Sequence, residues 1–412
     1  MSRLGIARQI REIRTDPALR WFGCAVALTN ALSMLHWRSR DAVGFLASGT
    51  DAICWPLLPH CEFLRVLSAG EVAWTFRAFF AASLLVAGLF AVRKTVGFAY
   101  AGLAALTLVK LLILALDFRL RANQHYMALW VTLAFLFLPR KRDAIRVLLV
   151  LFYVWASSIK FNADWLSGAA LAGPLWFVPA NLTAAACVYV VFLELVVSWG
   201  LLAARGWVFW GAFAQFLLFH AMSWSQVGFF YPLLMFLLLL IFPLARLIAP
   251  PEAPPQREES LLARLFRLRL NPATYGLIAL FSFCQLIPVL IPGDEKTTGE
   301  GRLYALHMVD ARIVCRGWAV LHRRDGSVYE VELNRGLLTR IACDPIVVAE
   351  RGRNFCRHAR EAGSEVAEVD LHLVSRRYGE TASRQVIDLP GFCAHPVRYN
   401  PFWHNRWILP GG

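Results

Sequence analysis

Long apolar stretches separated by short polar ones dominate the first 292 residues of the chain. They run for about 16 to 22 residues each, which is long enough to cross a bilayer core as a helix. We therefore predict an α-helical polytopic membrane domain over residues 1–292, with about nine transmembrane helices. The predicted spans are approximately 20–36, 72–92, 96–116, 124–138, 144–159, 183–204, 206–222, 226–248 and 273–292.

The pattern changes after the last span. Charged residues now alternate with apolar ones, and Asp325-Gly326 is a dipeptide typical of tight hairpin turns. Residues 293–412 are therefore predicted to form a separate α+β domain. Its predicted elements are strands at 318–321, 328–333 and 366–374 and a helix at 345–362.

A Pro-rich linker at 249–260 separates the eighth and ninth spans. Proline-rich chains are extended and stiff, so this segment is predicted to be a spacer on the cytoplasmic side. A basic amphipathic stretch, Ser260 to Leu270, follows it. We expect that stretch to lie on the inner membrane surface.

Composition supports a membrane protein: 58% of the residues are hydrophobic and only 17% are charged, yet the net charge is +14. Lys and Arg are distributed unequally, with 17 in the segments on the side of the N-terminus and 7 in the alternate loops. The positive-inside rule therefore predicts a cytoplasmic N-terminus and a periplasmic or lumenal C-terminal domain, in a bacterial inner membrane or a eukaryotic one. The positive charge is thus a topological signal that needs no nucleic-acid partner.

The chain has nine cysteines, and no C-x2-C pair stands near a matching one, so the sequence gives little support for a zinc site. Cys393, His395 and His404 form only a loose cluster, for which we favour a structural role. The spacing alone leaves the disulfide pairing open.

Polar side chains at membrane depth are costly, so function is sought among them first. Three groups are predicted at the outer ends of spans, and one carboxylate lies near mid-membrane. They are Asn123-Gln124-His125 at the start of the fourth span, Lys160 at the end of the fifth, His220 at the end of the seventh, and Glu194 within the sixth.

Each of these residues also has a structural explanation. Asn123 could cap its helix, the two histidines could be satisfied interfacial residues, and Lys160 could extend to the membrane surface. In the functional interpretation, burial makes the Lys160 amine available as a base. Glu194 is either neutral or paired, with His220 or with Lys160 as its partner.

Common catalytic sequences are absent. The chain contains no Gly-x-Ser-x-Gly, P-loop, His-Glu-x-x-His or dinucleotide-binding glycine pattern. It also lacks the matched pair of Gly/Pro-broken spans that is typical of secondary transporters.

Residues 157–168, SSIKFNADWLSG, resemble a segment of the vitamin K-dependent gamma-glutamyl carboxylases in which a Lys precedes an Asp-Ala-Asp-Trp run and a Gly. The same group includes bacterial proteins with the horizontally transferred transmembrane (HTTM) domain. The resemblance covers most of residues 20–405. Further similar segments are NQHY at 123–126, LEL at 193–195, FHAM at 219–222 and the Arg324-Asp325-Gly326 turn.

The resemblance implies a membrane enzyme that couples oxidation of a reduced quinone, vitamin K or menaquinone, to carboxylation of glutamate in a secreted or periplasmic peptide or protein. Dioxygen and carbon dioxide would be co-substrates, and no metal would be needed. Lys160 would be the base that deprotonates the reduced quinone. His125, beside Asn123 or Gln124, would stabilise the carbanion or position the glutamate, and His220 would line the same pocket.

The resemblance also implies a disulfide between Cys54, in a CWPLL segment, and Cys356. Cys61, Cys315, Cys343 and Cys393 are predicted on the same side and could pair otherwise.

The soluble domain departs from the family. Where the family has a Tyr, a Trp and an Arg that face the glutamate, this chain has Tyr304, then His307 and Met308, then Arg312 or Arg316, so the Trp is missing. Two alternative functions therefore remain. An HTTM protein could mature a secreted peptide or toxin by other chemistry, or the chain could be a non-enzymatic module that binds quinone, lipid or a partner protein.

Overall fold

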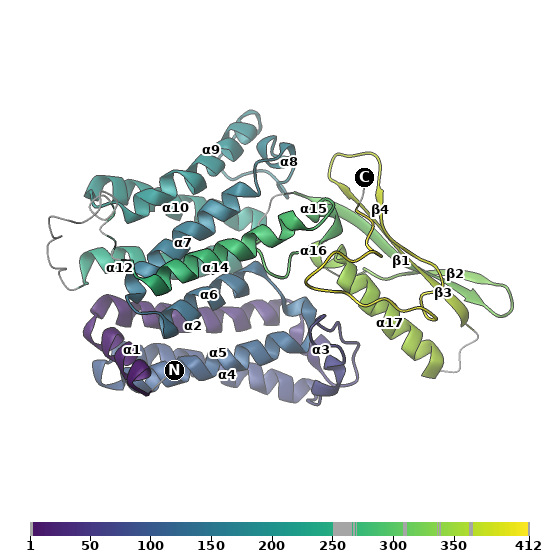
Figure 1. The fold of residues 1–412 in the computed structure, drawn as a ribbon, viewed down its shortest axis with the longest axis horizontal. Coiled ribbons are helices and arrows are strands. Elements are labelled where there is room, and N and C mark those ends of the chain that lie inside the picture. Colours follow the sequence, from purple (N-terminus) through teal and green to yellow (C-terminus); the bar gives the residue numbers. More distant parts are fainter. Residues whose placement is uncertain are drawn as a thin grey trace. The chain divides into compact units, whose positions relative to one another are not determined.

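The computed structural model describes residues 3–249, 266, 268, 270–307, 311–335, 337, 339–361 and 366–410. Two compact units make up the chain, and each is described by itself (Figure 1). The helical unit consists of Met1–Asp41, Ala73–Leu112 and Ala122–Phe283. The sheet unit consists of Ala42–Val72, Ile113–Arg121 and Cys284–Gly412. Most of the predicted linker and amphipathic stretch, and Met308, lie outside the described residues.

The helical unit contains long helices over every predicted span, together with an N-terminal helix that precedes them. Its α-helices are α1 (Arg3–Thr15), α2 (Pro17–Ser39), α4 (Ala69–Ala91), α5 (Val96–Leu116), α6 (Asn123–Phe137), α7 (Lys141–Ser158), α8 (Ala163–Leu166), α9 (Thr183–Leu195), α10 (Gly206–Val227), α11 (Phe230–Leu239), α12 (Ile241–Leu247) and α14 (Pro272–Leu286). Short 3-10 segments are η2 (Arg93–Thr95), η4 (Ala180–Leu182) and η5 (Val197–Leu202).

Among the described residues, six helical stretches are long and apolar enough to cross a membrane: Pro17–Ser39, Ala69–Ala91, Arg93–Leu116, Ala180–Leu202, Phe230–Leu247 and Pro272–Leu290. The three other predicted spans are helical as well. However, α6 has only 15 residues, α7 begins with Lys141-Arg142-Asp143, and α10 contains Gln215 and His220. The fold is thus a helical protein with six candidate membrane spans and an α+β unit.

The start of α2 explains why this helix, which forms the first predicted span, is longer than its apolar run suggests. Asp16 is the N-cap, and its side chain accepts hydrogen bonds from the amides of Ala18 and Leu19. Pro17 occupies the first helical position, where its missing N–H costs nothing. These signals begin the helix before Trp21, so α2 reaches 23 residues.

The sheet unit is built around four antiparallel strands in the order β2-β1-β3-β4. The predicted hairpin, third strand and helix are confirmed, and β4 was not predicted. The elements are α3 (Ala42–Leu46), η1 (Cys61–Leu64), η3 (Phe118–Leu120), η6 (Ile287–Leu290), α15 (Glu295–Thr298), β1 (Ile313–Arg323), β2 (Val328–Glu332), α16 (Thr339–Ala342), α17 (Pro345–Glu361), β3 (Val366–Arg377) and β4 (Arg384–Leu389).

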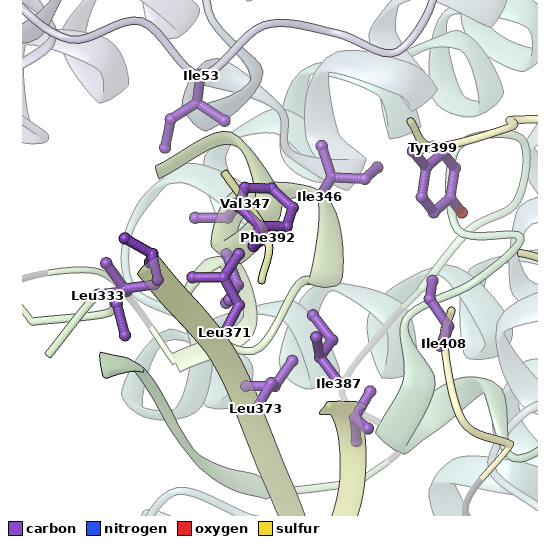
Figure 2. Packing of buried hydrophobic residues seen from close by; sticks show 14 of the residues in the cluster. Ile53, Leu333, Ile346, Val347, Leu371, Leu373, Ile387, Phe392, Tyr399 and Ile408 are labelled. Atoms are coloured by element: carbon purple, nitrogen blue, oxygen red, sulfur yellow. The ribbon is translucent and has the colours of Figure 1, made fainter. Parts of the chain in front are cut away.

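Helix α17 packs on β1 and β3, and a buried core lies between them (Figures 1 and 2). Two segments from the first part of the chain complete this core through Ile53 and Phe118. The Phe118 amide donates to the Ile53 carbonyl at 2.7 Å, and Asn354 of α17 donates to the Ala52 carbonyl at 2.7 Å. The sheet unit therefore includes more than the predicted domain at 293–412.

The implied Cys54–Cys356 disulfide is wrong. Cys54 pairs with Cys61, Cys356 with Cys393, and Cys315 with Cys343. The turn between Cys54 and Cys61 brings their Cα atoms to 5.3 Å, so a local partner is available seven residues away. All three disulfides belong to the sheet unit, which is consistent with an extracytoplasmic location.

The loose Cys393, His395 and His404 cluster does not act as a unit. Cys393 is held in its disulfide, and His404 Nδ1 lies 2.8 Å from Glu300 Oε2. Both residues thus have structural partners.

Candidate functional site

The segment from Lys160 to Gly168 forms a tight turn between α7 and α9. Lys160 follows the end of α7, and Asn162 is the N-cap of α8, where its Oδ1 accepts from the Trp165 amide at 3.0 Å. The Trp165 indole N–H donates to the Cys187 carbonyl of α9 at 3.0 Å. This turn fixes the position of the Lys160 side chain and connects it to α9.

Lys160 and Glu194 form a buried ion pair. Both carboxylate oxygens of Glu194 lie 2.5 Å from Lys160 Nζ, and the two residues are 3% and 0% exposed. The Trp165 ring centroid is 4.8 Å from Nζ. Of the alternatives open for Glu194, the structure therefore selects pairing with Lys160.

His220 lies beside this pair and completes the lysine cluster: Lys160, Glu194, Tyr153, His220 and Tyr231. Tyr153 Oη is 2.7 Å from His220 Nε2, and the rings of His220 and Tyr231 are 5.2 Å apart. His220 is also close enough to Lys160 for the two side chains to interact electrostatically. In the part of the chain that the structure describes, His220 Nδ1 and Tyr231 Oη have no hydrogen-bond partner.

His125 lies in a second group, the histidine cluster, with His36, Trp37, Lys110 and Phe230. Its ring is 4.8 Å from Trp37, 5.0 Å from Phe230 and 5.8 Å from His36. His125 is 2% exposed, and neither of its ring nitrogens has a hydrogen-bond partner among the described residues. Lys110 interacts electrostatically with His125 and donates to Ser33 Oγ at 2.8 Å.

The first turn of α11 joins the two clusters. Phe230 stacks on His36 at 4.2 Å and contacts His125, whereas its neighbour Tyr231 contacts His220. Because consecutive helical residues point about 100° apart, one turn can serve both groups. The structure thus links the histidine and lysine clusters through two adjacent aromatic residues.

The remaining predicted residues occupy other environments. Asn123 and Gln124 are half-buried at the start of α6; the N-cap there is Ala122, so the capping explanation for Asn123 is wrong. Tyr304 stacks on Phe402, with ring centroids 5.9 Å apart, in the sheet unit. In the same unit, the guanidinium carbon of Arg312 lies 4.0 Å from the centroid of the Tyr378 ring.

Four polar or ionisable members of the clusters were not among the predicted site residues: His36, Lys110, Tyr153 and Tyr231. Each is a polar residue within an apolar helix, and this is the signal that could have identified it. Spacing could not, because the four residues lie on four different helices.

Gly168 is expected to be required for the lysine turn. It has φ +86°, and a Cβ at this position would lie 2.7 Å from Thr183 Cγ2. Gly168→Ala should therefore lower the free energy of unfolding by about 1–3 kcal/mol, measured by denaturation of the detergent-solubilised protein. Gly173→Ala, where a Cβ meets open space, is the matched control. Equal stability of the two variants would contradict this assignment.

No family model, curated protein or solved structure matches the chain.

Proposed function

We propose that the protein is a vitamin K-dependent gamma-carboxylase-like membrane enzyme, which carboxylates glutamate in a peptide or protein while a reduced quinone is oxidised. The observation that carries the proposal is the convergence of Lys160, Glu194 and His220 in one buried cluster. These residues come from α9, α10 and the turn after α7. Buried polar groups within membrane-spanning segments are typical of functional sites.

The proposal includes nine membrane crossings with a cytoplasmic N-terminus. Segments assigned to the cytoplasm hydrogen-bond to one another: the Lys141 amide donates to Glu12 Oε1 at 2.9 Å, and Asn271 donates to the Pro139 carbonyl at 3.0 Å. Segments assigned to the outside do the same, since Gln226 donates to the Gly173 carbonyl at 3.1 Å. Helix α6 is about 22 Å long, so it must tilt little and lie at a locally thin or shielded position.

The lysine cluster suits a flat ring that carries two hydroxyl groups. Trp165 and Phe219 supply aromatic surface beside Lys160, with ring centroids 4.8 and 6.0 Å from Nζ. His220 Nδ1 and Tyr231 Oη are buried polar atoms without a partner among the described residues, and each could bond a quinone oxygen. Once bound, a reduced quinone would supply the driving force through its oxidation by dioxygen.

Within this proposal, Lys160 and Glu194 act together as the base. A proton that passes along the Lys160–Glu194 hydrogen bond leaves a neutral amine beside a protonated carboxyl, which avoids separated charges in a dry site. With a reduced quinone bound, the neutral amine would accept a proton from one of its two hydroxyl groups. The buried surroundings exclude water, which would otherwise compete for the proton.

Within this proposal, the histidine cluster binds the glutamate side chain of the substrate. His125 has two ring nitrogens without partners among the described residues, and the Lys110 ammonium lies close enough to interact with it electrostatically. These groups would hold the γ-carboxylate and stabilise the charge that develops when its neighbouring carbon loses a proton. Partners of the protein are therefore membrane lipid, quinone and an exported peptide or protein.

The test uses the full protein in lipid nanodiscs with a glutamate-containing peptide, labelled bicarbonate, dioxygen and either reduced menaquinone or reduced vitamin K. Wild-type protein should fix label into the peptide. Lys160→Arg should reduce the rate at least 100-fold, because arginine keeps the positive charge beside Glu194 but does not release its proton. Lys94→Arg, at an exposed position, is the matched control and should keep full activity.

Label fixation that is equal in wild type and Lys160→Arg would contradict the role of Lys160. No fixation by wild-type protein with either quinone would contradict the reaction itself. A mass change other than the addition of carbon dioxide on a co-expressed exported peptide would instead support the alternative of a different maturation reaction.

A further inference from the structure

The sheet unit contains a cavity of about 550 Å³ that the proposed reaction does not use. A volume of this size is typical of ligand sites. Pro59, Phe392, Pro396 and Val397 supply its apolar walls. Its charged lining comes mostly from one side of α17 and from Arg398. Phe392 both lines the cavity and belongs to the buried core of the unit, where Figure 2 shows it among the packed side chains.

Arg353, Arg357 and Arg360 follow each other at helical spacings of four and three residues. This spacing places all three on the same face of α17, and all three line the cavity. We name them, together with Arg398, the arginine face. Like charges so close together on a helix repel one another, so their arrangement needs a compensating interaction.

Each of the three helical arginines is positioned by the protein. Arg353 bonds Glu350 at 2.9 Å, Arg357 bonds Glu62 at 3.3 Å, and Arg360 donates to the Cys393 carbonyl at 2.7 Å. A guanidinium has five N–H donors, so these contacts leave donors available for a ligand. One is Arg353 Nε, which is buried and has no partner among the described residues.

Three acidic residues, Glu62, Glu350 and Glu361, line the cavity beside the four arginines of the arginine face, which leaves the arginines in excess. Burial raises the pKa of the Glu350 carboxyl, although Arg353, its partner in the ion pair, partly opposes the shift. Glu62 is occupied by Arg357. Arg360 and Arg398 are exposed and have no ion pair with a carboxylate among the described residues, so their guanidinium groups can meet the carboxylates of a ligand.

We propose that this cavity binds an extended acidic peptide through bidentate contacts between the arginine face and its carboxylates, with apolar atoms against Phe392 and Val397. Planar guanidinium groups that are held in place match carboxylates especially well. The inference deepens the proposed function and rests on it for the choice of a glutamate-rich peptide. The cavity would retain the substrate peptide.

The test is the binding of a fluorescein-labelled hexaglutamate peptide to the full protein in nanodiscs, followed by fluorescence anisotropy without quinone. Arg360→Glu/Arg398→Glu should weaken binding about tenfold or more. Arg324→Glu, an exposed arginine in the β1–β2 turn, is the matched control and should leave binding unchanged. Arg360→Gln/Arg398→Gln should give a smaller loss, and hexaglutamine should bind much more weakly than hexaglutamate.

Equal binding of hexaglutamate by wild type and both double variants would overturn the proposal. So would an equal loss in Arg324→Glu, or equal binding of hexaglutamate and hexaglutamine. The binding assay contains no quinone, so hexaglutamate can bind the cavity even if the protein does not carboxylate glutamate. Conversely, loss of peptide binding at the cavity would not affect the assignment of the lysine cluster, which the label-fixation assay tests.

Discussion

Replacing Glu194 with leucine is expected to lower the free energy of unfolding by about 3–5 kcal/mol, because it leaves the Lys160 ammonium buried without its counter-charge. Lys160→Met should lower the free energy of unfolding by a similar amount, since it leaves the Glu194 carboxylate buried without its counter-charge. The measurement is chemical denaturation of the detergent-solubilised protein. Lys94→Met, at an exposed site, is the control and should change stability by less than about 0.5 kcal/mol.

The double variant Lys160→Met/Glu194→Leu tests whether the lost stability comes from an unpaired buried charge. Apolar residues of similar volume often replace a buried ion pair at little net cost, so the double variant should recover most of the lost stability. It should nevertheless fix no carbon dioxide, because the proposed base is gone. Single variants as stable as wild type would contradict the importance of the ion pair.

A second large effect is expected at Asp117, a fully buried carboxylate in the sheet unit. Its oxygens accept hydrogen bonds from the Ile53 amide at 3.2 Å and from the Arg119 guanidinium at 2.7 and 2.8 Å. The buried Arg65 guanidinium is 4.0 Å away. Asp117→Ala would leave two guanidinium groups and two backbone amides, those of Ile53 and Arg119, without this partner, so a loss of about 3–5 kcal/mol in the free energy of unfolding is expected.

The same substitution should release the segment around Arg65, which is 6% exposed in the folded protein. Trypsin cleavage after Arg65, followed by mass spectrometry, should therefore be faster in Asp117→Ala than in wild type. Asp51→Ala, an exposed carboxylate in the same segment, is the matched control and should change stability by less than about 1 kcal/mol. Cleavage as slow in Asp117→Ala as in that control would refute the role of Asp117.

The helices could be predicted from sequence because long apolar runs have few alternatives to helix in a membrane. The strand at Arg384–Leu389 was missed because it has only six residues and no clear alternation. Its pairing with β3 and the burial of Val386 and Ile387 come from tertiary contacts. Local propensity gives little information about such a strand.

The candidate site could be predicted in part. The cost of burying charge pointed to Lys160 and Glu194, but periodicity defines only the faces of one helix and not the helix that packs against it. Lys160 and Glu194 are 34 positions apart in the chain, so the sequence left both Lys160 and His220 open as partners of Glu194. The contacts of Phe230 and Tyr231 with the two clusters gave no signal at all, because aromatic residues are common in apolar helices.

The pairing of the cysteines could not be predicted from the sequence for a different reason. Six cysteines allow 15 pairings, and spacing does not choose among them. The implied partners Cys54 and Cys356 do lie on neighbouring segments, since Asn354 bonds the Ala52 carbonyl. Each cysteine nevertheless pairs within its own segment or with the chain that follows β4.

The bond between Asn354 and Ala52 spans 302 residues of chain, and this has a consequence for biosynthesis. At about 5–20 residues per second, roughly 15–60 s separate the synthesis of the two residues. During this time, the segment between α2 and α4 has been synthesised, but the strands and helix that cover Ile53 have not. Cys54 and Cys61 are only seven residues apart, so they can form their disulfide in this interval. This bond would prevent either cysteine from pairing wrongly with cysteines that are synthesised later.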